Sequence, residues 1–449
     1  MAGQYKLLKE TKGRCPECHT PAPAQIFERD GQVFLQRSCV EHGPFESRIS
    51  SDARFYNVSK GNRCCGDGCG CEPSASNGAN LFEKLSTCIA LIEIVDSCNL
   101  ACPTCFADSP VQKEVDCMSV ENFKQRVQDL IDRKGKIEIL QLSGGEPTLH
   151  PNFFEILQWS QTHADIDYVL VNTNGVRLAN DSSFAEELDR RYQRGGLQLY
   201  LQFDGVQEAA QKALRGSDLR KTKQRAIEVA GAMDGDGLPI TLAMTVTQDN
   251  LPHLWETVEY GLQYSHVRGV AFQPFFESGR SCSTEKPVDR LNPADIILSL
   301  IGHSGGLLSD RDFTPLPCGD PNCHTIGYLL KTPEGIRSIA DYVDFSKVQG
   351  FLSNRLTWSL VDLAQCGCDQ EPLGDVLKQL EIDESHTFRL FIKPFMDAHS
   401  WDDDRIDRCC THVIRPDGKL DSFCRYYSGF PDTWHGPKPA SATIENAAK

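Results

Sequence analysis

A regular alternation of strand-like and helix-like segments constrains the fold of this chain more than any other feature. Buried strands are expected at six short apolar runs rich in β-branched residues: 88–95, 137–143, 167–173, 197–203, 240–246 and 267–273. Helices are expected at the amphipathic stretches between them: 119–133, 152–163, 183–193, 219–233 and 253–264. Strand–helix units in this order form a parallel sheet, either closed into a barrel or open and doubly wound. The sequence therefore predicts an α/β fold.

Polar, glycine-containing segments follow these strands. CNLACPTC follows the first strand, SGGEPTLHP the second, NTNG the third and QFDG the fourth. In the second segment, Gly144 and Gly145 would let a ligand approach the backbone closely, and Glu146 places a carboxylate at the strand end. Because ligands collect at the carboxyl edge of parallel strands, we expect these segments to build one site.

The first of these segments holds Cys98, Cys102 and Cys105 at C-x3-C-x2-C spacing. A closed tetrahedral metal site has four ligands, so this segment is one ligand short. The spacing favours an iron–sulfur cluster. A structural zinc ion with a distant fourth ligand and an ordinary electron-transfer cluster are the alternatives from spacing alone.

Most of the other cysteines lie in short-spaced groups that flank the strand–helix region. The chain has 20 cysteines, and such groups are metal ligands more often than disulfides in a reducing compartment. Cys15 and Cys18 form a C-x2-C pair, followed by Cys39. We interpret His42 as a turn residue. Cys88 and Cys117 are expected to pack as small apolar groups, and PDG at 416–418 predicts a hairpin with cysteines at both ends.

Charge and hydropathy limit the partners. The net charge of −16 disfavours a nucleic-acid backbone, which calls for a basic face. No apolar run is long enough for a transmembrane helix, and the N-terminus lacks the apolar core of a signal peptide. A cytoplasmic protein is expected, with peripheral contact with a membrane left open.

The pairing of CNLACPTC at 98–105 with GGEP at 144–147 resembles the radical S-adenosylmethionine (radical SAM) superfamily. The resemblance implies a partial (β/α)6 barrel and a [4Fe–4S] cluster whose fourth iron is left for SAM. The chemistry would come from a 5′-deoxyadenosyl radical and not from a catalytic side chain. By position, SAM would be bound by Phe106 at the adenine, by Gly144, Gly145 and Glu146 at the methionine amino group, and by Asn172, Asn174, Gln202 and Asp204 at the ribose or carboxylate.

A narrower resemblance, to the archaeal tetraether synthase family and its pterin-methylating relatives, covers nearly the whole chain. It rests on segments such as CPEC, VNTNGVRLA, LPCGDPNCH and CTHVIRPDGKLDSFCRYY. It implies a rubredoxin-like single iron at Cys15, Cys18 and Cys39, with a zinc ribbon as the alternative. It also implies auxiliary iron–sulfur clusters, for which the candidate ligands are Cys64, Cys65, Cys69, Cys71, Cys318, Cys323, Cys366, Cys368, Cys409, Cys410 and Cys424.

Four segments are predicted on this basis. They are a metal-binding domain at 1–60, a cysteine-rich linker at 61–87, the barrel at 88–280 and an auxiliary iron–sulfur domain at 281–449.

The favoured reaction is carbon–carbon coupling of lipid alkyl chains, because RCCGDGCGC does not reproduce the second cysteine triad expected of the pterin-methylating relatives. Radical methylation of a pterin or another small heterocycle is the alternative. A non-catalytic electron carrier or zinc scaffold is the alternative of another class. The expected partners are a lipid or small-molecule substrate and an electron donor such as ferredoxin or flavodoxin.

Overall fold

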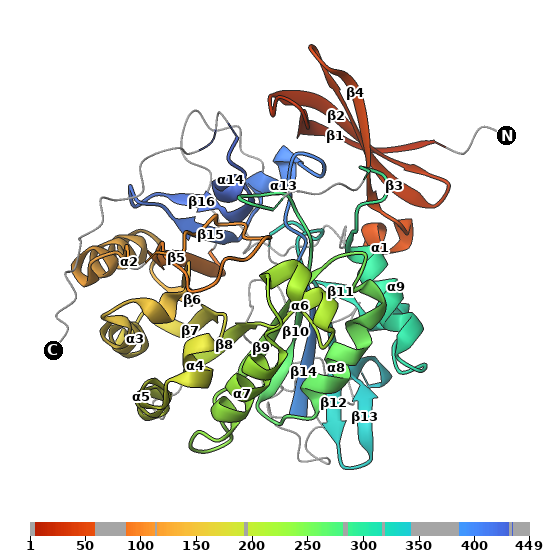
Figure 1. Cartoon of the computed structure of the whole chain (residues 1–449). Helices are drawn as coiled ribbons and strands as arrows, with labels where there is room; N and C mark the ends of the chain where they lie inside the picture. The colour runs from red at the N-terminus through yellow and green to blue at the C-terminus, as the bar shows by residue number, and fades with distance from the viewer. Residues whose placement is uncertain are drawn as a thin grey trace.

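The computed structural model describes residues 5–58, 87–112, 115–192, 196–281, 286–316, 319–342, 386–430 and 433 of the 449-residue chain (Figure 1). These residues form two sheets. A small antiparallel sheet near the N-terminus stands beside a large, mostly parallel sheet that is covered by helices.

The N-terminal sheet is a meander of four strands: β1 (Lys6–Arg14), β2 (Pro21–Arg29), β3 (Gln32–Cys39) and β4 (Gly43–Ser50). Asp30 and Gly31 join β2 to β3 and both have positive φ, which matches the hairpin turn that suits the right-handed strand twist. Helix α1 (Ala53–Val58) follows and packs against this sheet. The small apolar core includes Ile26, Val33 and Leu35.

The six predicted strands are confirmed as a run of parallel neighbours: β5 (Ile89–Val95), β6 (Ile137–Gly144), β7 (Ile166–Thr173), β8 (Leu197–Gln202), β9 (Ile240–Val246) and β10 (Val267–Pro274). The helices between them are α2 (Val120–Lys134), α3 (Phe153–Thr162), α4 (Val176–Asn180), α5 (Ser182–Tyr192), α6 (Glu208–Arg215), α7 (Arg220–Gly231) and α8 (Leu254–Leu262). The predicted α/β barrel-type fold is therefore correct.

Residues after 281 extend the same sheet at both of its edges. Strand β14 (Thr387–Ile392) pairs in parallel with β10, and β15 (Thr411–Ile414) pairs in parallel with β5. The predicted boundary at 280/281 thus divides the sequence but not the sheet. The predicted hairpin is confirmed as β15 with β16 (Leu420–Ser422), which is antiparallel to it. The other elements are α9 (Pro293–His303), β11 (Thr314–Pro315), β12 (Thr325–Thr332), β13 (Gly335–Ser338), α13 (Asp403–Asp407) and α14 (Phe423–Tyr427), with 3-10 turns at Pro147–Leu149, Leu251–His253, Asp310–Asp312 and Ile339–Asp341.

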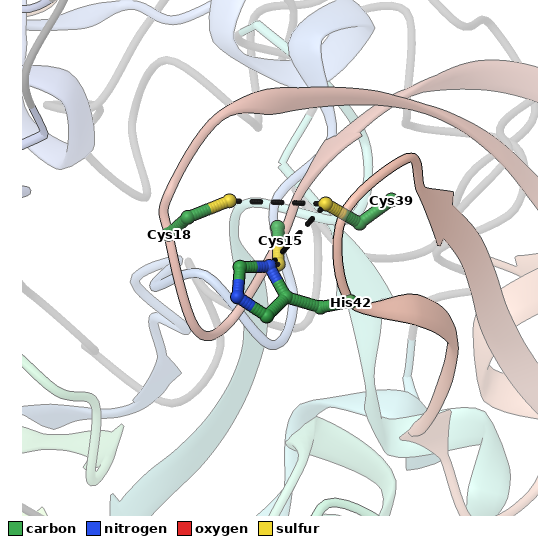
Figure 2. A group of neighbouring side chains, drawn as sticks. All are labelled: Cys15, Cys18, Cys39 and His42. Carbon is green, nitrogen blue, oxygen red and sulfur yellow. Dashed lines mark hydrogen bonds between the residues drawn. The ribbon is translucent and has the colours of Figure 1, made fainter.

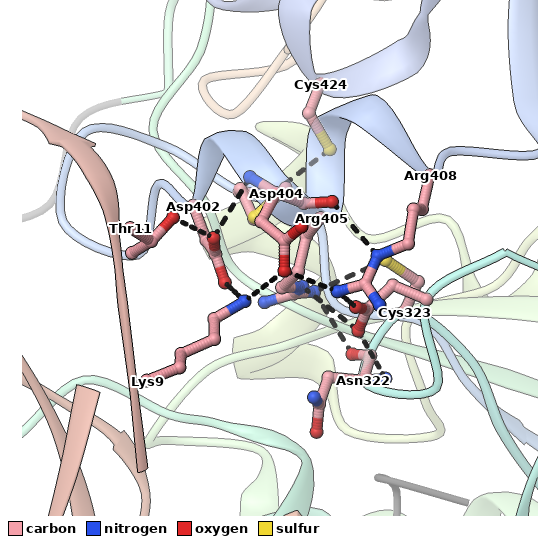
Figure 3. Close-up of polar contacts among 11 residues, drawn as sticks. Lys9, Thr11, Asn322, Cys323, Asp402, Asp404, Arg405, Arg408 and Cys424 are labelled. Atoms are coloured by element: carbon pink, nitrogen blue, oxygen red, sulfur yellow. Dashed lines mark hydrogen bonds and ion pairs between the residues drawn. The ribbon is translucent and has the colours of Figure 1, made fainter. Parts of the chain in front are cut away.

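The N-terminal sheet is attached to the C-terminal segment by polar contacts. Lys9 of β1 lies 2.7 Å from a carboxylate oxygen of Asp402 and 2.8 Å from one of Asp404 (Figure 3). Thr11 donates a 2.6 Å hydrogen bond to Asp402, whose carboxylate also caps α13. These contacts place the N-terminal sheet beside the C-terminal cysteines. No helix in the described part of the chain is long and apolar enough to cross a bilayer.

Candidate active site and metal centres

The cysteine loop after β5 and the carboxyl ends of the neighbouring strands line one pocket, called here the strand-end pocket. Most of the residues predicted for the SAM-binding site are among its walls: Cys98, Cys102, Cys105, Phe106, Gly144, Gly145, Glu146, Asn172, Asn174 and Gln202. The structure therefore brings together residues that are up to about a hundred positions apart in the sequence. Asp204 is not part of the pocket wall; it is fully buried.

The two glycines of GGEP serve the packing of the chain against itself. A Cβ atom on Gly144 would lie 2.0 Å from the carbonyl oxygen of Val95, and one on Gly145 would lie 2.1 Å from that of Ser97. Two backbone hydrogen bonds hold the segments this close. The amide of Gly145 donates to the carbonyl oxygen of Val95 (2.7 Å), and the amide of Glu146 donates to that of Ser97 (3.0 Å). The Cβ positions of both glycines therefore face the backbone that leads into the cysteine loop, while the glycines themselves line the strand-end pocket, and close approach of a ligand to them stays a prediction.

Glu146 ties the end of β6 to the end of β7. Its carboxylate is 1% exposed and accepts hydrogen bonds from the hydroxyls of Thr148 and Thr173, each at 2.7 Å. It also accepts a 2.7 Å bond from the amide of Asn174. These bonds fix the position of the carboxylate at the wall of the strand-end pocket. Binding of a substrate amino group by Glu146 remains a prediction.

Replacing Gly145 with Ala is expected to disrupt the cysteine loop. The φ angle of Gly145 is not in the left-handed region, so the cost comes from the clash with the backbone of Ser97. The loop must move by more than a bond length, and we expect loss of cluster absorbance near 400 nm after anaerobic reconstitution. Gly302→Ala is the matched control because its Cβ would meet no atom within 4 Å. Full cluster loading of Gly145→Ala would contradict this role.

Arg215 is a pocket residue that the sequence analysis did not assign. It projects from the end of α6 and forms a two-bond ion pair with Asp204, with one contact of 2.9 Å. The same guanidinium donates to the side chain of Gln202 at 3.0 Å. Burial by itself lowers the pKa of Arg215, but the ion pair raises the pKa above its ordinary value. The sequence signal for Arg215 was its place in LRGSDL. This segment comes at the end of the helix that directly follows QFDG, so its arginine returns to the strand end.

Cys98, Cys102 and Cys105 fit a cluster better than a single ion. Within the described residues they do not belong to any set of ligand atoms lying within 4.8 Å of one another. A cluster binds each thiolate at a different iron and so needs a wider spread than one ion. Burial raises the pKa of Cys98 to about 11, so an attached iron is needed to hold it as a thiolate. The amide of Leu100 donates to this sulfur at 3.4 Å, which suits a thiolate ligand.

Cys15, Cys18, Cys39 and His42 form a second, tight metal site (Figure 2). Their ligand atoms all lie within 4.8 Å of one another, and His42 Nδ1 is 3.6 Å from the sulfurs of both Cys15 and Cys39. The interpretation of His42 as a turn residue is therefore wrong. Its spacing from Cys39 repeats the C-x2-C spacing of the first pair, which was the missed signal. Three thiolates and one imidazole are a structural zinc set, unlike the four thiolates of a rubredoxin-type iron.

The electrostatics of this N-terminal metal site favour metal binding. The hydrogen bond from His42 lowers the pKa of Cys39 to about 6, and bonds to Thr20 lower the pKa of Cys18. The thiolate, which is the form that binds metal, is therefore favoured at Cys39 and Cys18, whereas burial raises the pKa of Cys15.

His42→Ala is expected to weaken zinc binding by more than the roughly 10–100-fold that loss of an outer-shell partner costs, because a direct ligand is removed. The rate of zinc release to a coloured chelator measures this. His19→Asn is the control, since His19 directly follows the ligand Cys18, is not itself a ligand, and has a positive φ that Asn tolerates. Release at the wild-type rate from His42→Ala would exclude the four-ligand site.

Four further cysteines form the C-terminal cysteine group: Cys323, Cys409, Cys410 and Cys424. Burial raises the pKa of all four thiols, to about 12 for Cys410 and about 11 for Cys424, and neighbouring thiols raise the pKa further at Cys409, Cys410 and Cys424. The buried ammonium of Lys393 and the guanidinium of Arg405 lie among them, and Arg405 donates to the sulfur of Cys323 at 3.6 Å (Figure 3). Buried thiols beside cations suit a cluster of net negative charge.

The remaining predicted ligands lie outside the described residues: Cys64, Cys65, Cys69, Cys71, Cys318, Cys366 and Cys368. Cys117 is a buried free thiol in the main core, as expected. Cys88 is buried and packs against Cys410. Cys88 is itself disulfide-bonded, but not to Cys410, so its expected role as a free packing thiol is corrected.

A larger cavity of about 410 Å³, called here the barrel cavity, runs along the inner face of the sheet. It shares Phe106, Asn172, Gln202 and Gln273 with the strand-end pocket, so the two are adjacent. Its uncharged polar lining comes from strands β6 to β10 and from the start of β15: Gln141, Tyr168, Asn172, Gln198, Tyr200, Gln202, Thr241, Gln273 and Thr411. Several of these side chains bond to one another, as Gln273 does to Tyr200 at 2.6 Å and Gln202 to Asn172 at 3.0 Å. The cavity thus offers amide and hydroxyl groups beside the cysteine loop.

Known protein families match the segments that contain the N-terminal metal site and the cysteine loop. Residues 7–51 match the HMPTM N-terminal zinc ribbon domain, and residues 92–261 match the radical SAM superfamily. The chain is 27% identical to 7,8-dihydro-6-hydroxymethylpterin dimethyltransferase of Methanocaldococcus jannaschii, over 94% of this chain and 93% of that protein. It is 26% identical to mycofactocin maturase MftC of Mycobacterium tuberculosis, over 38% of this chain and 41% of that protein.

Two solved structures are each similar to about half of this chain. Streptococcus suis SuiB bound to S-adenosylmethionine is 13% identical with a TM-score of 0.37, and the match covers 49% of each chain. Native anSMEcpe with bound AdoMet and a Cp18Cys peptide is 23% identical with a TM-score of 0.36, over 48% of this chain and 58% of that one. The chain thus spans less than two thirds of MftC and of both solved structures.

Proposed function

Since this chain is an enzyme of the radical SAM superfamily, we propose that it abstracts a hydrogen atom from a small planar heterocycle of the pterin class, as the first step of a carbon methylation. The observation that supports this substrate class is the barrel cavity with its amide-rich lining beside the cysteine loop. Cys98, Cys102 and Cys105 would hold a [4Fe–4S] cluster, which would supply the electron for cleavage of SAM to methionine and a 5′-deoxyadenosyl radical.

The size and chemistry of the barrel cavity support a heterocycle. A volume of about 410 Å³ is in the usual range for a site that encloses a small organic ligand. Glutamine and asparagine side chains each offer a donor and an acceptor, which matches the edge of a pterin ring. Phe391, Phe395 and Phe423 also line the cavity and provide faces on which a flat ring stacks.

The strand ends would bind and orient SAM. Glu146 provides a carboxylate in a fixed position for the amino group, and Arg215, held by Asp204, provides a guanidinium for the carboxylate. Asn172 and Gln202 line both the strand-end pocket and the barrel cavity, so they would lie between SAM and the substrate. Closely packed side chains at this boundary would exclude water from the reactive radical. The role predicted for Asp204 changes accordingly, from contact with SAM to orientation of Arg215.

The C-terminal cysteine group would hold an auxiliary iron–sulfur cluster. Lys393 supports this because its side chain lines the barrel cavity while its ammonium lies among the four thiols. A cluster there would be adjacent to the substrate and could exchange electrons with it. The donor of electrons to the enzyme would be a low-potential one-electron carrier such as ferredoxin or flavodoxin.

Coupling of lipid alkyl chains is the second candidate. It is favoured by the apolar half of the same lining, which includes Leu91, Leu170 and Val270. An amide without a partner favours the heterocycle over this candidate: the side chain of Gln141 makes no hydrogen bond within the described residues, although it lines the cavity. Burial of an alkyl chain against such a group would leave it unsatisfied.

Substrate-stimulated formation of 5′-deoxyadenosine separates the two candidates. Reconstituted enzyme with SAM and dithionite is assayed with 6-hydroxymethyl-7,8-dihydropterin or with a dispersed isoprenoid ether lipid. We expect stimulation and a methylated product with the pterin. Stimulation by the lipid alone would replace the first proposal with the second.

A further inference from the structure

Arg389 differs from the other buried or half-buried arginines at the barrel. It is the third residue of β14, and its side chain lines the barrel cavity. Arg215 and Arg290 are each paired with a buried aspartate, Asp204 and Asp397. The guanidinium of Arg389 makes no hydrogen bond or ion pair with the described part of the chain. A cation turned into a cavity without a counter-charge is costly unless a ligand supplies one.

The charge around the barrel cavity is positive. Its described lining includes Arg389 and Lys393 but no aspartate or glutamate. Lys393 is already engaged, because it donates to Thr411 at 3.1 Å and lies among the thiols of the C-terminal cysteine group. Among the described residues that line the cavity, Arg389 is therefore the cation available to a ligand. Low-dielectric walls concentrate this positive potential in the cavity.

The position of Arg389 in β14 gives its distance from the end of the barrel cavity that adjoins the strand-end pocket. Lys393 follows Arg389 by four residues, and its amide bonds to Phe272, next to the Gln273 that lines both the strand-end pocket and the barrel cavity. Four residues of extended strand span about 13 Å. Arg389 thus marks the end of the barrel cavity that is farther from the cysteine loop.

We propose that the substrate carries an oxyanion, a carboxylate or a phosphate, that Arg389 binds roughly 10 Å from the reacting carbon. The inference rests on the proposed function in that it uses the same cavity. The planar guanidinium donates two parallel hydrogen bonds to such a group. A pterin with a short acidic arm has this shape. In an ether lipid, the headgroup phosphate is separated from the far carbon by the whole alkyl chain.

Binding of a free oxyanion tests the site without any assumption about the substrate. Inorganic phosphate is titrated against the reconstituted, SAM-bound enzyme at constant ionic strength, and the Tm is recorded. We expect the Tm to rise by about 2 °C at saturation, as for any ligand of the native state. Arg389→Gln should abolish the rise. Arg268→Gln should keep it, because Arg268 precedes the strand partner of Arg389 but does not line the cavity. No rise in the wild type, or an equal rise in Arg389→Gln, would overturn the inference.

The source of the oxyanion is identified in a second experiment. The KM for 5′-deoxyadenosine formation is compared for 6-hydroxymethyl-7,8-dihydropterin, its phosphate ester and 7,8-dihydropteroate, with phospholipid vesicles as a separate arm. We expect an acidic pterin to have a KM at least about tenfold lower than the neutral one, and Arg389→Gln to remove this difference. If only the vesicles stimulate the reaction and Arg389→Gln weakens that stimulation, the pterin proposal fails and the oxyanion site stands. If neutral and acidic pterins react alike, the pterin proposal stands and the oxyanion site fails.

Discussion

Cys102→Ala is expected to reduce 5′-deoxyadenosine formation to background. Cys102 is 9% exposed, lines the strand-end pocket with Cys98 and Cys105, and has no neighbouring cysteine that would replace it within the described residues. With two thiolates left, the cluster that delivers the electron to SAM is not retained. Anaerobic reconstitution followed by chromatographic detection of 5′-deoxyadenosine measures the effect.

Cys424→Ala is the matched comparison. Cys424 is equally buried but belongs to the C-terminal cysteine group, beyond the strand-end pocket. We expect this variant to cleave SAM and to lose product formation, with less iron per chain than the wild type. Deoxyadenosine formation by Cys102→Ala above background, or its loss in Cys424→Ala at full SAM-cluster content, would contradict the assignment of the two groups.

Arg215→Met is expected to destabilise the protein by about 3–5 kcal/mol, because it leaves the carboxylate of Asp204 buried without its partner. Binding of SAM should weaken as well, since Arg215 lines the strand-end pocket. Denaturant unfolding measures the first effect, and equilibrium dialysis of labelled SAM measures the second.

A double variant separates the ion pair from simple loss of packing. Asp204→Asn combined with Arg215→Met should cost less than the sum of the single changes by roughly 1–3 kcal/mol, as is usual for charges in contact. Asn also tolerates the positive φ of residue 204. Arg220→Met is the control, because Arg220 pairs with Asp218 and Glu208 on the solvent-exposed surface and should change neither stability nor SAM binding measurably. Additive costs of the two single changes would show that the pair is not coupled.

The sequence predicts the barrel well because its local and global signals agree. The strand predicted at 240–246 is the strand observed, and Ser119 caps α2 as its position before a helical stretch indicates. Six parallel strands with polar carboxyl ends then place the cysteine loop and Glu146 at one site without further information.

What the sequence did not predict depends on contacts between distant segments. The pairing of β14 with β10 and of β15 with β5 joins residues more than a hundred positions apart, and no local pattern encodes that choice. The roles of Asp204 and Arg215 depend on the ion pair between them. Residue 145 must be glycine because the backbone of Ser97 leaves no room for a Cβ atom. His42 is the exception, since the C-x2-H spacing after Cys39 was visible in the sequence.

The most direct test of the account is transfer of deuterium from substrate to product. Reconstituted enzyme is incubated with SAM, dithionite and a dihydropterin deuterated at its saturated ring carbon and its side-chain carbon, and 5′-deoxyadenosine is analysed by mass spectrometry. The account predicts 5′-deoxyadenosine that carries one deuterium atom from the pterin. Unlabelled 5′-deoxyadenosine would contradict the pterin as the substrate of hydrogen abstraction, and no 5′-deoxyadenosine at full iron and sulfide content would contradict radical SAM chemistry at this site.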